Sequence, residues 1–96
     1  MKELKPPPEA YVDPKAFEIA RIWAADRKQV VTFASELWED PRYWGMMLVD
    51  LARHVARAYE LNGKMDEGEA LSLLRRGFEA EWVEQTTNID GRLGDN

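Results

Sequence analysis

The fold of this chain is decided by residues 40–63, DPRYWGMMLVDLARHVARAYELNG. The segment begins with Asp40 and Pro41, which are typical of a helix N-cap and first turn, and it ends with Asn62 and Gly63, a left-handed stop. Between these ends, large apolar side chains recur every three or four residues, namely Trp44, Leu48, Leu51, Val55 and Tyr59. This spacing predicts one amphipathic helix of about 22 residues, roughly 33 Å long.

A second helix is predicted directly downstream. Asp66 stands three residues before Glu69, which resembles a capping box with Asp in the Ser or Thr role. The apolar stripe of this helix, which we expect to be buried, consists of Leu71, Leu74, Phe78 and Trp82. Because only about three residues connect the two helices, they must run antiparallel.

Upstream of residue 40, residues 14–35 are ambiguous. Asp13 and Pro14 are compatible with a helix start, but apolar and polar side chains then alternate, and residues 30–33 form a β-branched and aromatic run. We expect an antiparallel hairpin with strands near 18–25 and 29–34. The polar turn between them contains neither Gly nor Asn, so its register stays open.

These elements predict a single α+β domain over residues 14–85, in which a β-hairpin is followed by two antiparallel helices packed on one face of the sheet. A chain of 96 residues with 45% hydrophobic content fits one such domain. Flexible tails are expected at the Pro-rich residues 1–13 and at residues 86–96.

Composition excludes several classes of function. The net charge is −5 and no basic patch is present, so neither nucleic acid nor an anionic membrane is an expected partner. The absence of cysteine removes disulfides and thiolate sites, and a single histidine cannot build a multi-histidine site, so we expect no metal and no cofactor. No apolar run approaches the roughly 20 residues of a membrane helix, and the charged start does not resemble a signal peptide. The predicted location is cytoplasmic.

Four aromatic residues are the predicted contact residues of an interaction surface: Trp23, Trp38, Trp44 and Tyr59. Trp38 and Trp44 flank the helix start, and they either form a binding face or clamp the hairpin onto the helix, with Gly45 permitting close backbone approach. The clamp is favoured, because a small domain needs its largest side chains for its core.

The only group expected to titrate near neutral pH is His54. It follows Asp50 by four residues on the same helix, beside Arg53, so the three form a possible ligand-binding or pH-responsive set. The sequence contains no Ser-His-Asp arrangement and no nucleophile elbow. We therefore expect a boundary or interface histidine and no catalytic residues, and the chain is not predicted to be an enzyme.

Apolar surface that the two helices cannot cover predicts self-association. A two-stranded sheet is marginal in water, and helices on one face leave the other face and both edges open. We expect a non-catalytic interaction or assembly module that acts as a homodimer. The alternative is an accessory subunit that binds an unidentified protein. The rival hypothesis is a small-molecule-binding protein or minor enzyme, with a Trp-lined pocket polarised by Asp50, Arg53 and His54.

Three motifs resemble a known family: WEDP at residues 38–41, WGMMLVDLARHVA at residues 44–56, and RGFEAEW at residues 76–82. They are similar to small bacterial proteins that are grouped only as a domain of unknown function, over about residues 14–84. The resemblance implies a bacterial protein of about this length with no assigned reaction, cofactor or partner. It transfers no catalytic residue to this sequence.

Overall fold

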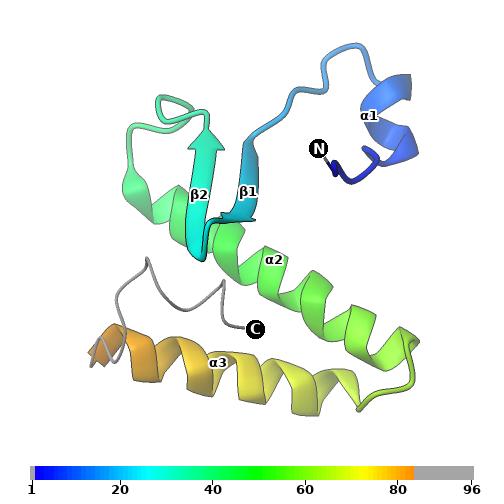
Figure 1. Cartoon of the computed structure of the whole chain (residues 1–96), viewed down its shortest axis with the longest axis vertical. Coiled ribbons are helices and arrows are strands. Elements are labelled where there is room, and N and C mark those ends of the chain that lie inside the picture. Colours follow the sequence, from blue (N-terminus) through cyan, green and yellow to red (C-terminus); the bar gives the residue numbers. More distant parts are fainter. Residues whose placement is uncertain (1, 84–96) are drawn as a thin grey trace.

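The computed structural model describes residues 2–83. In chain order its elements are α1 (Pro8–Val12), β1 (Ala20–Ala25), β2 (Lys28–Phe33), α2 (Pro41–Leu61) and α3 (Glu67–Val83) (Figure 1). The predicted α+β order, a hairpin followed by two antiparallel helices, is confirmed, whereas the packing of both helices on one face of the sheet stays a prediction. The short helix α1 lies within the segment for which flexibility was predicted, and that flexibility stays a prediction. The predicted tail at residues 86–96 lies outside the described residues.

The hairpin is closed by a two-residue turn of left-handed backbone. Asp26 and Arg27 have φ values of 51° and 60°, as in the mirror-image turns that match the twist of antiparallel strands. The resulting register pairs Trp23 with Val30, and the Ala34 N–H donates to the Ile19 carbonyl at 2.8 Å beyond the strand ends. The turn therefore forms without Gly or Asn, at the steric cost that φ > 0 imposes on residues with a Cβ.

Both ends of α2 are set by local contacts. Asp40 accepts a hydrogen bond from the Arg42 backbone N–H at 2.9 Å, which caps the first turn. At the other end Gly63 has a φ of 69°, its N–H donates to the Glu60 carbonyl, and the Lys64 N–H donates to the Tyr59 carbonyl at 2.9 Å. This is a Schellman motif, so the predicted stop at Gly63 is confirmed.

The start of α3 is held by residues from two elements. The Asp66 carboxylate accepts from the Gly68 N–H at 3.0 Å, as the predicted cap requires. The Glu60 carboxylate, from α2, accepts from the Glu67 N–H at 2.9 Å. The two helices are thus joined at their turn by a hydrogen bond as well as by the chain, which supports their antiparallel arrangement.

The most deeply buried residues of the two helices are small. In the described part of the chain the buried hydrophobic residues are Ala56 and Ala70, and Ala52 lies half-buried one turn before Ala56. The predicted buried stripe of α3 is wrong for Phe78 and Trp82, which are exposed, whereas Leu71 and Leu74 are half-buried. The rings of Phe78 and Trp82, one turn apart on the helix, stack on each other with centroids 5.6 Å apart, so each covers one face of the other.

The hairpin contacts the start of α2. The ring of Phe33, at the end of β2, lies edge-on to Trp44 with centroids 5.6 Å apart. In Figure 1, α2 lies between the hairpin and α3, which packs along α2. Within residues 2–83, no helix has the length and apolar character that crossing a membrane requires.

Candidate interaction surface

An aromatic cluster joins the hairpin to α2. Trp38 meets Trp44 at 4.9 Å with the rings nearly perpendicular, and it also lies 6.3 Å from Tyr43. With Phe33 against Trp44, the cluster combines the end of β2, the following loop and the first turn of α2. Edge-to-face pairs of this kind are favourable beyond their buried area. Trp38 and Trp44 are both half-buried, so they contribute to a clamp and keep part of their surface in solvent.

Gly45 does not serve the close approach that was expected next to this cluster. A Cβ at this position would have no atom within 4 Å other than those of its chain neighbours and of the backbone of the same helix. The expectation is therefore wrong. Trp44 projects from the helix towards Phe33, and this large ring holds the hairpin away from the backbone of α2.

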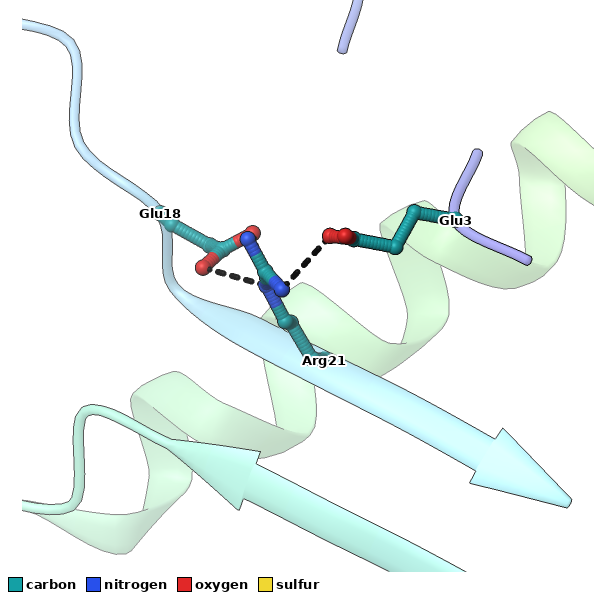
Figure 2. Close-up of polar contacts among 3 residues, drawn as sticks. All are labelled: Glu3, Glu18 and Arg21. Carbon is teal, nitrogen blue, oxygen red and sulfur yellow. Dashed lines mark hydrogen bonds and ion pairs between the residues drawn. The ribbon is translucent and has the colours of Figure 1, made fainter. Parts of the chain in front are cut away.

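The segment before α1 is connected to β1 by an arginine. Figure 2 shows Arg21 between two carboxylates: its Nη1 lies 2.8 Å from Glu3 and its Nε lies 2.8 Å from Glu18. The hydrogen bond to Glu18, with the charges of Glu18 and Glu3, raises the pKa of Arg21. Beside this contact lies an open hollow of about 270 Å³, lined in part by Leu4, Ile22 and the half-buried Trp23. No spacing in the sequence signals a contact between residues 18 positions apart.

The predicted polar set is exposed on α2. His54 Nε2 lies 3.5 Å from Asp50 Oδ2, and both side chains are more than 70% exposed. Arg53 is exposed as well. Two hollows in the described residues are lined by other parts of the chain, one at β1 and one of about 420 Å³ at Pro8, Glu9, Val12 and Asp13. Among residues 2–83 no group of three or more His, Asp or Glu residues converges as a metal site would.

Tyr59 belongs to a row of uncovered apolar side chains. The α2 stripe, as we call this row, consists of Leu48, Leu51, Val55 and Tyr59, which are 37–48% exposed. Tyr59 is 15 residues from Trp44, or about 22 Å along the helix, so the structure does not gather the four predicted aromatic contacts into one site.

A second apolar surface lies on the hairpin. Because opposite residues of an antiparallel pair share a face, Ile22 and its partner Val31 lie on the same side as Phe33. We call these three residues the sheet face, and all three are about half exposed. The hairpin thus presents apolar surface next to the end of the α2 stripe nearest Trp44.

The circumference of α2 divides into three sectors at about 100° per residue. Its Asp, Glu and Arg side chains gather in one sector, which consists of Arg42, Asp50, Arg53, Arg57 and Glu60. A second sector contains Ala52 and Ala56, where α3 packs. The third contains the α2 stripe. Each apolar sector of a helix needs a neighbouring element to shield it from water. Of the contacts described above, α3 shields the alanine sector, and only the clamp at Trp44 lies at the sector of the α2 stripe.

The comparisons with known proteins agree with this fold. The model of a family described as "Domain of unknown function (DUF5076)" matches residues 3–86, so the match includes part of the segment that the three motifs left outside. One similar solved structure is described as that of a "putative pyruvate dehydrogenase from the photosynthetic bacterium Rhodopseudomonas palustrus CGA009". It is 35% identical, has a TM-score of 0.68, and is matched over 92% of this chain and 90% of that chain. The search of curated proteins gave no match.

Proposed function

Because the chain belongs to the DUF5076 family, whose function is unknown, we propose a role from its surface: it is a non-catalytic interaction module that assembles as a homodimer. One observation carries the proposal. Large apolar side chains of the hairpin and of α2 are half exposed, while the buried hydrophobic residues of the described part are two alanines. A single copy leaves this surface in water, and a second copy is the simplest cover for it.

Exposed apolar side chains on two elements support a partner. The α2 stripe and the sheet face are 37–56% exposed, and both lie on the described part of the chain. Apolar side chains that gather on one surface mark contact with another protein.

The hollows of this chain do not suit the dehydrogenase activity that the name of the similar solved structure implies. Breaking a carbon–carbon bond beside a carbonyl calls for an organic cofactor that stabilises the carbanion, and such cofactors occupy deep pockets. The two hollows at β1 and α1 are open, and neither contains Asp50, Arg53 or His54. These observations favour an interaction surface over the Trp-lined pocket of the rival hypothesis.

The proposed location is the cytoplasm, and the proposed partner is a second copy rather than nucleic acid or a membrane surface. The net charge of −5 disfavours binding to phosphate backbones and to anionic headgroups. Carboxylates outnumber basic side chains, so long-range attraction favours neither of these partners.

Sedimentation velocity of the purified chain at micromolar concentration tests the proposal. We expect twice the monomer mass of 11.1 kDa, retained on tenfold dilution. A species of monomer mass over that range contradicts the homodimer. In parallel, the protein is incubated with pyruvate, an added thiamine cofactor and an electron acceptor. Carbon dioxide release above a protein-free blank contradicts the non-catalytic role.

A further inference from the structure

The α2 stripe is an uncovered apolar row on a helix that already packs against α3. We propose that two copies associate through their α2 stripes, with the two α2 helices packed in opposite directions about a two-fold axis near Leu51 and Val55. This inference rests on the proposed function, because it names the contact surface of the homodimer. In the dimer, α3 of the same copy packs against the alanine sector of each α2, and α2 of the other copy packs against its α2 stripe.

The spacing of the stripe suits packing against an identical helix. Leu48, Leu51, Val55 and Tyr59 follow one another at intervals of three, four and four residues, which keeps them on one side of α2 over three turns. Rows of side chains with this spacing can insert between the same rows of a second helix. The stripe is therefore continuous and long enough for a helix pair.

The charges are arranged so that two copies can meet. Each copy has a net charge of −5, so like charges repel unless they are kept out of the contact. The positions that flank the α2 stripe include none of the Asp, Glu, Lys or Arg side chains of the helix; they are Met47, Ala52 and His54. The sector of Asp50, Arg53, Arg57 and Glu60 faces away from the stripe. An acidic chain with an uncharged sector fits a second copy, and it gives a basic partner no charge complement at that sector.

The hairpin determines the direction of packing. It lies against the start of α2 through Phe33 and Trp44 (Figure 1). At the other end of the stripe, Tyr59 is 44% exposed. Parallel helices would bring both hairpins to the same end and leave both Tyr59 ends uncovered. Packing in opposite directions places each hairpin beside the Tyr59 end of the other copy. The sheet face can then cover that end, which accounts for both uncovered surfaces at once.

A pair of glutamates on the stripe tests the seam. Leu51→Glu with Val55→Glu places four carboxylates at the proposed axis, and we expect the dissociation constant to rise at least 100-fold. The matched control is Arg53→Glu, which changes the net charge by the same two units in the opposite sector and should leave the dimer intact. Far-UV circular dichroism checks that each variant keeps its helices. If the glutamate pair leaves a helical dimer intact, the seam is wrong while the proposed homodimer stands.

Cross-linking tests the seam without added charge, because the chain has no cysteine of its own. With opposite directions, Leu51 of one copy lies beside Val55 of the other. A refolded mixture of the Leu51→Cys and Val55→Cys variants should therefore form disulfide-linked dimers at least tenfold faster than either variant alone. Arg57→Cys, in the charged sector, is the control and should not cross-link. Self-linking by each stripe variant alone, without the mixed product, contradicts the opposite directions.

An edge of the sheet is the competing contact surface. Hydrogen-bonded and non-hydrogen-bonded residue pairs alternate along β1 and β2, and Gln29 belongs to a non-hydrogen-bonded pair with Ala24. Its N–H therefore points away from β1. Gln29→Pro removes that outward donor and keeps the ladder between the strands. The dimer should persist in this variant. Dissociation on Gln29→Pro would show strand pairing between copies and overturn the α2 seam, and a monomeric parent chain would overturn the proposed function itself.

Discussion

At the scale of single residues, Asp40 connects a helix cap to an ion pair. Its carboxylate accepts from the Arg42 backbone and lies 2.7 Å from the Arg42 guanidinium. The side-chain hydrogen bond from Arg42, followed by the backbone one, lowers the pKa of Asp40 below its ordinary value of 3.8. A carboxyl group whose pKa is lower in the folded state stabilises the fold above its unfolded pKa. That contribution is lost as the pH falls from about 4 through the folded value.

The Asp40→Asn variant tests this pH dependence. We expect the variant to be less stable than the parent chain at pH 6, because the amide caps the helix but cannot pair with Arg42 as an anion. The difference should shrink below pH 4, where the parent carboxyl becomes protonated. Urea denaturation of both proteins between pH 3 and pH 6 measures it. A difference that is constant over this range would show that the charge of Asp40 is not involved.

At the scale of elements, the glycine inside α2 and the glycine at its end should respond in opposite ways to alanine. Gly45 lies inside the helix with open space where the alanine methyl group would stand, so Gly45→Ala should raise the free energy of unfolding by about 1 kcal/mol. Gly63 has a φ of 69°, so Gly63→Ala should lower it by about 1 kcal/mol. Chemical denaturation at fixed protein concentration measures both. Destabilisation by Gly45→Ala would show that this position contacts another surface.

Helix caps explain why elements were the most predictable level of this protein. The bounds of α2 and α3 depend on Asp40, Gly63 and Asp66, each of which acts within one turn of itself. The hairpin register was not predictable in the same way. It depends on a left-handed backbone at Asp26 and Arg27, residue types that seldom adopt it, so composition did not indicate this turn.

At the scale of the whole molecule, folding and assembly should be linked. If much of the apolar surface is covered only in the homodimer, the unfolding midpoint depends on protein concentration. We expect the thermal midpoint to rise by several degrees when the concentration is raised 100-fold. Scanning calorimetry over that range measures the shift, and the Leu51→Glu, Val55→Glu variant provides the concentration-independent control. An unchanged midpoint in the parent chain would contradict coupling between folding and assembly.

The predicted site residues were only partly brought together. Trp38 and Trp44 share one cluster, whereas Trp23 lies on β1 and Tyr59 near the far end of α2. Spacing within the helix explains the Asp50 and His54 pair, since residues four apart are neighbours on a helix. It does not reveal whether such a pair lines a pocket, because that depends on what packs around it.

The sequence by itself determined the elements and their order, because caps, turn formers and apolar periodicity act over a few neighbouring residues. It also predicted uncovered apolar surface, because a two-stranded sheet with helices on one face leaves its other face and both edges open. Only the tertiary structure decided which sector α3 takes: the small side chains of Ala52, Ala56 and Ala70 allow the closest approach, and the α2 stripe is left outside. The contact of Glu3 with Arg21 was decided in the same way, since it joins distant positions that no local pattern relates.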